Sequence, residues 1–295
     1  MSTITKKMSF QEIQKLYEQS KPYILKEAKP AYTHYQIKCS ECTITAYTSG
    51  KVVFQGKDLD WMKPEPQTQA DDQAGSDEVG TGDYFGPVVV CACIVKKEAK
   101  ETLVQLGIQD SKQITDEKIR KMAPKIKDLC PHSILIVQNP KYNTIHEQHN
   151  MVDIKCRLHN QAYVNLKHKG QTLPKQIIID QFVQEKSYYR YLQHEKEVIR
   201  NIHFETKAEN KYVAVAAASI LARNAFLEVW DAMEAKYNFQ FIKGASAKVD
   251  HCAKQFVDQY GFEELYKVAK MHFKNTEKLK GLYNDDHDDL YPKMF

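Results

Sequence analysis

The sequence of 295 residues has no hydrophobic run long enough to cross a membrane. Its longest apolar run, AVAAASILA at residues 214–222, is far shorter than the ~20 residues that a membrane-spanning helix requires. The opening residues, MSTITKKMSFQEIQ, also lack the apolar segment of a secretory signal peptide. We therefore expect a cytoplasmic protein with no membrane partner.

The cysteines do not form a regular pattern of pairs in the sequence. The seven cysteines are odd in number and scattered, which does not suit a disulfide framework. Cys39 and Cys42 form one C-x-x-C, but no second pair of cysteines or histidines follows at the spacing of a structural zinc site, which needs four ligands. We interpret these two cysteines as strand or turn residues.

The charge balance is modest. With 42% hydrophobic and 27% charged residues, the composition is that of a globular protein. The net charge of +4 permits an anionic partner but does not require one.

A polar segment, KPEPQTQADDQA at residues 63–74, contains two prolines and almost nothing that could pack in a core. Such a composition is typical of a linker. We therefore predict an N-terminal domain at residues 1–66, a linker at 67–73 and a second domain at 74–295.

The N-terminal segment predicts a small α+β domain. An amphipathic helix is expected over residues 10–19, followed by strands at THYQIK, CTITAY and KVVFQG, the last two joined by a turn at SGK. Residues 1–62 hold nine lysines against six acidic residues. This excess suits a sheet that binds nucleic acid, and it suits ordinary solvated lysines equally well.

After the linker, strand and helix patterns alternate, which predicts a sheet with helices on both faces. Strands are expected at AGSDEV, VVVCACIV, SILIVQ, QIIIDQF and VIRNIHFET, and helices at TDEKIRKMAPKIKDL, at residues 144–169 and at residues 212–237.

The stretch GSDEVGTGDYFGP places two adjacent acids, Asp77 and Glu78, next to a strongly apolar strand. A buried carboxylate needs a cation or a hydrogen-bond network. Neighbouring residues on an ideal strand point to opposite faces, so the two acids would share one site only if Gly80 and Gly82 allow the strand to twist. The glycine spacing does not match a dinucleotide-binding fingerprint.

Two further acids close apolar segments. Asp180 ends the run IIID, and Glu209 precedes the alanine-rich helix. Taken alone, Asp180 could be a strand terminator or a helix cap, and Glu209 could simply favour the helix dipole. If these acids converge with Asp77 and Glu78, the four carboxylates require cations, and oxygen ligands favour Mg²⁺ or Mn²⁺.

These motifs together resemble the type 2 ribonucleases H. The likeness runs through SDEVGTGDYFGPVVV, DSKQIT, IIIDQF, KAENKYVAVAAASILAR and KMHFKNTEK, and so covers the chain from about residue 74 onward. The sequence is more similar to the ribonuclease HIII branch than to HII. The glycine turn has Thr81 where HII has arginine, the fourth acid is Glu209 where HII usually has aspartate, and an extra N-terminal domain is present.

The resemblance implies a ribonuclease H-like mixed sheet flanked by helices, with a small TATA-binding-protein-like α+β domain that binds substrate. It implies an endonuclease that cleaves the RNA strand of RNA/DNA hybrids with two Mg²⁺ or Mn²⁺ ions and leaves 5′-phosphate and 3′-hydroxyl ends. Matching positions make Asp77, Glu78, Asp180 and Glu209 the metal-binding catalytic acids. We expect the protein to be a monomer.

Substrate contacts are expected at three places. The exposed amides of Gly80, Thr81 and Gly82 are candidates for reading the 2′-hydroxyl that DNA lacks. Candidates for phosphate contacts are Ser111, Lys112, Lys207, His272 and Lys274, although a lysine can simply be solvated and a histidine can simply be packed. Because the HII-type arginine is missing, a run of ribonucleotides is the expected substrate, rather than a single ribonucleotide in DNA.

Two alternatives remain open from the sequence. The protein could bind hybrids without cutting them, although clustered acids facing phosphate would weaken such binding. It could also be another two-metal enzyme, such as a DNA nuclease or a phosphatase.

Overall fold

The computed structural model describes residues 2–40, 42–56, 71–108 and 114–288. The chain divides into two compact units, Met1–Gln67 and Thr68–Phe295. Each unit has its own sheet and its own core.

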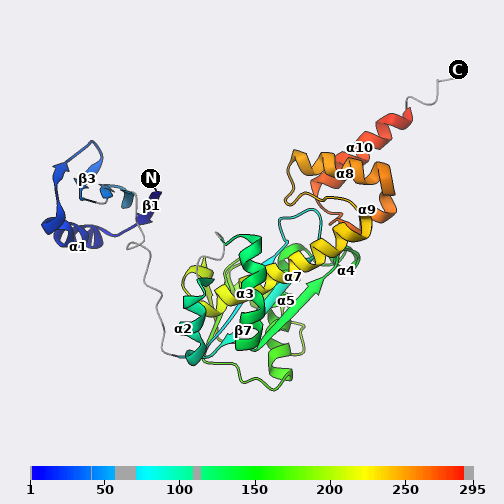
Figure 1. Cartoon of the computed structure of the whole chain (residues 1–295), viewed down its shortest axis with the longest axis horizontal. Helices are drawn as coiled ribbons and strands as arrows, with labels where there is room; N and C mark the ends of the chain where they lie inside the picture. Colours follow the sequence, from blue (N-terminus) through cyan, green and yellow to red (C-terminus); the bar gives the residue numbers. More distant parts are fainter. Residues whose placement is uncertain (1, 41, 57–70, 109–113, 289–295) are drawn as a thin grey trace. The chain divides into compact units, whose positions relative to one another are not determined.

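The N-terminal unit is an antiparallel sheet packed on one helix (Figure 1). Its elements are β1 (Ser2–Lys7), α1 (Phe10–Ser20), the 3₁₀ turn η1 (Lys21–Tyr23), β2 (Lys26–Ala28), β3 (Thr33–Lys38), β4 (Cys42–Tyr47) and β5 (Lys51–Gly56), with strand order β1-β5-β4-β3-β2. Ser9 and Glu12 form a capping box that starts α1. The predicted helix, three strands and final turn are confirmed, whereas β1 and β2 were not predicted.

The core of this unit lies between α1 and one face of the sheet. Ile13 of α1 packs in one cluster with Ile37, Ile44 and Phe54 of the three central strands. Because side chains alternate along a strand, the residues beside them lie on the opposite face. Among the described residues of this unit, no helix covers that face.

The second unit is a mixed sheet with helices on both faces, as predicted. Its strands are β6 (Gln73–Val79), β7 (Val88–Val95), β8 (His132–Val137), β9 (Gln176–Asp180) and β10 (Ile202–Glu205), in the order β10-β9-β6-β7-β8. The pairs β6–β7 and β7–β8 are antiparallel, while β6–β9 and β9–β10 are parallel.

The helices of this unit form two layers and a C-terminal group (Figure 1). They are α2 (Lys97–Gln105), α3 (Asp116–Leu129), α4 (Asn139–His146), α5 (Met151–His168), α6 (Glu185–Tyr191), η4 (Ala208–Asn210), α7 (Val213–Tyr237), α8 (Ala247–Tyr260), α9 (Phe262–Val268) and α10 (Lys274–Asp288). Helices α7 and α3 cover one face of the sheet, and α5 with α6 covers the other.

The prediction of one continuous helix over residues 144–169 was wrong in one respect. The chain there forms the end of α4 and then α5, with a break at residues 147–150. Asn150 ends the break, because its side chain accepts a hydrogen bond from the backbone of Asp153 and so caps the start of α5.

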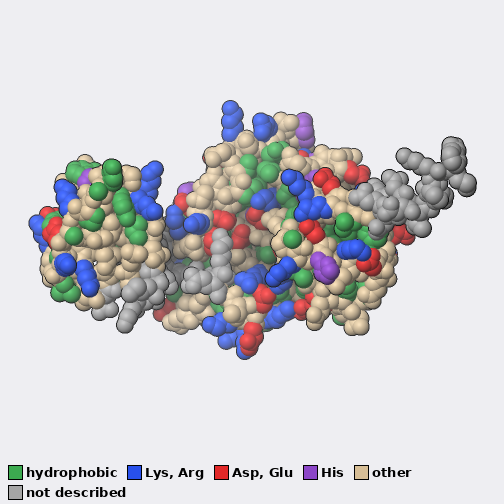
Figure 2. All heavy atoms as spheres, turned by 90° about the horizontal axis from the view of Figure 1, so that it is seen from above, with side chains coloured by type: hydrophobic (Ala, Val, Ile, Leu, Met, Phe, Trp, Pro, Cys, Tyr) green, Lys and Arg blue, Asp and Glu red, His purple; other side chains and the backbone are tan. Residues whose placement is uncertain are grey.

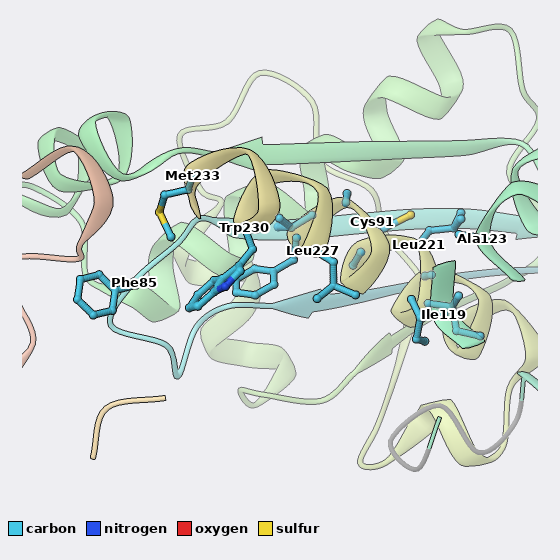
Figure 3. Packing of buried hydrophobic residues seen from close by; sticks show 14 of the residues in the cluster. Phe85, Cys91, Ile119, Ala123, Leu221, Leu227, Trp230 and Met233 are labelled. Carbon is cyan, nitrogen blue, oxygen red and sulfur yellow. The ribbon is translucent and has the colours of Figure 1, made fainter. Parts of the chain in front are cut away.

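Helix α7 is the centre of the larger core. Figure 3 shows Leu221, Leu227 and Trp230 of α7 packed near Cys91 of β7 and Ile119 of α3. Within the part of the chain that the structure describes, α7 is the one helix long and apolar enough to cross a membrane. However, 78% of its most apolar window is buried inside the protein. Core packing accounts for its composition.

Gly75 allows α7 to lie directly on β6. A Cβ atom at this position would come within 2.3 Å of the Val215 backbone nitrogen and 2.4 Å of the Ala214 carbonyl carbon. No side chain can be accommodated there unless the helix and the strand separate.

We expect Gly75→Ala to lower the free energy of unfolding by about 3 kcal/mol, because the added methyl group forces backbone atoms apart. Gly281→Ala is the matched control, since nothing lies within 4 Å of a Cβ at that helical position and alanine favours helices by up to ~1 kcal/mol. Urea denaturation of both variants measures the difference. A Gly75 variant as stable as the Gly281 variant would contradict the close packing.

Candidate active site

Three of the four predicted acids lie at one edge of the larger sheet. The parallel ladder between β6 and β9 pairs Ser76 with Ile179, so Asp77 and Asp180 follow at the next step on neighbouring strands. An Asp180 carboxylate oxygen accepts a hydrogen bond of 2.9 Å from the Ala208 amide. This bond fixes η4, which carries the buried Glu209, against the end of β9.

Asp77 faces α7. Its side chain is only 7% exposed, and it accepts hydrogen bonds from the Ser219 hydroxyl and from the Glu78 amide, the latter at 2.8 Å. Burial raises the pKa of Asp77 to about 8, and the negative charges of Glu78 and Asp180 contribute to the increase. The ionised form of this carboxylate is thus poorly compensated by its surroundings.

Glu78 faces α5, on the other side of the sheet. Its two carboxylate oxygens lie 2.6 Å from the Lys155 ammonium and 2.9 Å from His159 Nε2. Burial by itself would raise the pKa of Glu78, but the hydrogen bonds and positive charges of His159 and Lys155 lower it below its usual range. Adjacent residues of the same chemical type therefore have opposite electrostatic environments.

His159 is itself held on two more sides. Its Nδ1 lies 2.7 Å from the Ser76 hydroxyl, and its ring stacks on Phe182 with centroids 5.1 Å apart. The Lys155 ammonium lies 3.9 Å from the centre of the same Phe182 ring. Glu78 is thus oriented by a buried network that reaches from β6 to α5.

The twist at Gly80 and Gly82 that would bring both acids onto one face is not present. The β6–β7 ladder continues to the pair Val79–Val89, so the regular pleat extends past both carboxylates, and the backbone turns only at Gly80. Within the described ranges, no group of three or more acidic, histidine or cysteine side chains is arranged to hold a metal ion.

The glycine turn has one structural glycine and one open glycine. Gly80 has φ of +86°, and a Cβ there would lie 2.1 Å from the Pro87 carbonyl oxygen, so the turn requires glycine. Gly82 is exposed, and a Cβ there would have no atom within 4 Å. The fold does not need glycine at position 82, which leaves the surface of the turn open.

The predicted phosphate contacts are scattered. Ser111 and Lys112 lie outside the described residues, and Lys274 is exposed at the start of α10. His272 stacks on His146 at 4.0 Å and lies near the Tyr142 hydroxyl. The residue is exposed, but partial desolvation of its ring together with the positive charges of His146 and Lys270 lowers its pKa to about 4. The described contacts of His272 are with Tyr142, His146 and Phe273, and none of them is with the four acids.

Lys207 lies close to the acids along the chain. It precedes η4 and has φ of +56°, an unusual conformation for a residue with a side chain. The following turn buries Glu209 while Lys207 stays exposed.

Several residues around the acids were not predicted to be functional. They are Lys155, His159, Phe182, Ser219 and Lys270. Lys155 and His159 are four residues apart in a segment predicted to be helical, so their common helical face could have been found from the sequence. Their pairing with Glu78, about 80 residues earlier, could not.

Comparison with known proteins identifies related sequences and structures. The family model described as Ribonuclease HII matches residues 74–276, and one described as Domain of unknown function (DUF3378) matches residues 3–71. Ribonuclease HIII of Geobacillus sp. (strain WCH70) is 43% identical over 84% of this chain and 88% of its own length. Ribonuclease HIII of Streptococcus gordonii is 40% identical over 96% of this chain and 99% of its own length.

Solved structures give the same result. The structure described as Bst-RNase HIII in complex with Mn²⁺ has a TM-score of 0.71 and 35% identity, covering 96% of this chain and all of that one. Aquifex aeolicus RNase H3, at 22% identity and a TM-score of 0.56, shares the fold. From the family models, the relatives and the solved structures together, we conclude that this chain belongs to the ribonuclease HIII family.

Proposed function

We propose that this protein is an endonuclease that cleaves the RNA strand of RNA/DNA hybrids with the help of two divalent cations. The observation that carries the proposal is the placement of Asp77, Asp180 and Glu209 at one sheet edge, with Glu78 beside them on the same strand. Membership of the ribonuclease HIII family supports the choice of substrate.

The chemistry of these residues suits a divalent cation, although their side chains are not yet in a ligating arrangement among the described residues. Burial and the charges of Glu78 and Asp180 raise the pKa of Asp77, and a bound cation would relieve this repulsion. Asp77, Glu78, Asp180 and Glu209 would hold Mg²⁺ or Mn²⁺, whose preferred ligands are oxygen atoms. The related Bst-RNase HIII has been crystallised with Mn²⁺. When bound, two such ions supply positive charge to the attacking and leaving oxygens, and the products carry 5′-phosphate and 3′-hydroxyl ends.

The chain itself orients these acids before any substrate arrives. Ser219 directs Asp77, and the Ala208 amide directs Asp180. Lys155 and His159 hold both oxygens of Glu78, so Glu78 has to share or exchange these contacts when it serves as a ligand. Pre-oriented groups lower the reorganisation that the reaction requires.

Selection of RNA is assigned to the glycine turn. The amides of Gly80, Thr81 and Gly82 would read the ribose 2′-hydroxyl, and the open surface at Gly82 leaves room for the sugar. Thr81 cannot supply the charge of an arginine, so a run of ribonucleotides is the proposed substrate. Phosphate contacts are proposed for Ser111, Lys112, Lys207, His272 and Lys274.

The N-terminal unit, proposed to span residues 1–66, would add affinity through the open face of its sheet. Lys38 lies on that face, opposite Lys26 on one side and Thr43 on the other. Lys7 and Lys51 pair across the far edge of the same sheet. Polar and basic side chains of this kind bind a phosphate backbone without reading bases.

The surface carries charges of both signs. Figure 2 shows Lys and Arg side chains spread over both units, with acidic side chains between them on the face drawn. The small net charge of +4 agrees with this mixed surface.

The proposal is tested by cleavage of an end-labelled RNA/DNA hybrid beside an all-DNA duplex and a DNA duplex with one ribonucleotide. We expect cuts within the RNA run that require Mg²⁺ or Mn²⁺, little cutting of the other two substrates, and loss of cleavage by at least ~10³-fold in Asp77→Asn. Equal cleavage of all-DNA duplexes would point to a general nuclease. Binding without cleavage under either metal would point to a non-catalytic hybrid-binding protein.

A second prediction concerns stability against pH. The pKa of Asp77, about 8 in the fold, exceeds the ordinary value of 3.8, so the native state favours the protonated form. The stability that this preference provides is fully present below the ordinary pKa of 3.8 and is lost progressively as the pH rises from there to about 8. Without metal, Asp77→Asn should therefore melt about 3 °C or more above the natural protein at pH 8, and the gap should narrow toward pH 5.

Asp231→Asn serves as the control, because Asp231 lies in an exposed ion pair with Arg120. Added Mg²⁺ should raise the melting temperature of the natural protein and of this control more than that of Asp77→Asn. A gap that is constant from pH 5 to pH 8 would contradict the proposed strain at Asp77.

Removal of residues 1–66 tests the N-terminal unit. We expect hybrid binding to weaken roughly tenfold or more near physiological salt and its salt dependence to become flatter, because phosphate contacts are lost. The turnover at saturating hybrid should stay within about twofold. In the full chain, Lys38→Gln should weaken binding in the same direction, whereas Lys15→Gln on α1 should not. Unchanged affinity after the deletion would refute this role.

A further inference from the structure

Lys270 is a fully buried lysine, with 0% of its surface exposed. It follows α9, and no ion pair involves it among the described residues. Burial lowers its pKa to about 7, although the charge of Asp83 opposes the decrease. Lysines are almost never buried completely without a partner, so the fold must gain something specific from this side chain.

The hydrogen bonds that Lys270 donates all go to one loop. Its ammonium group donates to the carbonyl oxygens of Asp83 at 2.8 Å, Phe85 at 3.5 Å and Gly86 at 2.5 Å. Its backbone amide donates to the carbonyl oxygen of Tyr84 at 2.8 Å. One residue thus holds every carbonyl group from position 83 to position 86.

This loop is the continuation of the glycine turn. It begins at Gly80, directly after the two acids of β6, and ends at Pro87, directly before β7. The first half is loosely tied, because its described backbone bond, from the Asp83 amide to the Gly80 carbonyl, is long at 3.4 Å. The position of the Gly80–Gly82 amides therefore depends on how the second half is anchored.

Lys270 is in turn braced from α4. The side-chain amide of Asn143 donates to the Tyr266 and Ala269 carbonyls, and its oxygen accepts from the Met271 amide at 3.0 Å. These three bonds fix the backbone on both sides of Lys270. Asn139, also on α4, donates to the Gly86 carbonyl at 3.0 Å.

We propose that Lys270 is a positioning residue for recognition of the ribose 2′-hydroxyl. By holding the carbonyl groups of residues 83–86, it fixes the direction in which the amides of Gly80, Thr81 and Gly82 face the substrate. This inference rests on the proposed function, and it predicts that Lys270 affects the preference for hybrid over DNA without touching the reacting atoms.

The test compares Lys270→Met, which keeps the length and apolar stem but removes the donors, with the natural protein. Affinities for an RNA/DNA hybrid and for an all-DNA duplex are measured in the presence of a chelator, and KM and kcat are measured with Mg²⁺. We expect the hybrid preference to fall and the KM for hybrid to rise about tenfold each, with kcat changed by no more than about twofold.

Two variants frame the result. Lys267→Met removes an exposed lysine that pairs with Glu264 three residues earlier, and it should leave the hybrid preference unchanged. Gly82→Ala alters the open turn directly and should lower the preference with little effect on stability. An equal loss of affinity for hybrid and DNA in Lys270→Met, or an unchanged preference, would overturn the proposal.

If Lys270→Met does not fold, Asn143→Ser decides the question, because it weakens the brace and keeps the lysine. Amide hydrogen exchange should then increase in residues 80–87 but not in α2, and the hybrid preference should fall by about threefold or more. Faster exchange with full preference would overturn the proposal. Absence of any hybrid preference in the natural protein would instead refute the proposed function.

Discussion

The direct contact between α7 and β6 at Gly75 is the constraint on which the rest of the second unit depends. Because this glycine has no side chain, the helix lies against the strand with almost no space between their backbones. That approach brings Ser219 to Asp77 and places η4, just before α7, beside the end of β9. The arrangement of these acids therefore depends on the absence of a side chain at Gly75 as well as on their own positions in the chain.

The pleat of β6 places the two adjacent acids in different electrostatic surroundings. Asp77 is buried among negative charges, whereas Glu78 is held by Lys155 and His159 on the other face. On one side of the sheet, the negative charge of Asp77 has no positively charged neighbour among its described contacts. On the other side, the negative charge of Glu78 is balanced by the Lys155 ammonium. Both helical layers take part in the site, since α7 supplies the partner of the first acid and α5 supplies the partners of the second.

The loop that follows β6 joins this site to the C-terminal part of the unit. Its second half is anchored by Lys270, which is 187 residues from its Asp83 acceptor, and its first half remains open. Backbone donors are most effective when they are held in place before a ligand arrives, and Lys270 supplies such support to this loop. The N-terminal unit has a separate sheet with one open face, and it carries none of the four proposed acids.

The sequence alone predicted the strands of the larger sheet and the central helix, and it singled out Asp77, Glu78, Asp180 and Glu209 as candidates, because apolar periodicity and strand ends are local features. Family resemblance added the substrate and the metal. Only the tertiary structure decided the break before α5, the opposite orientation of Asp77 and Glu78, and the partners Lys155, His159 and Lys270. These contacts join residues about 80 to 190 positions apart, and packing rather than local pattern selects which distant side chains meet.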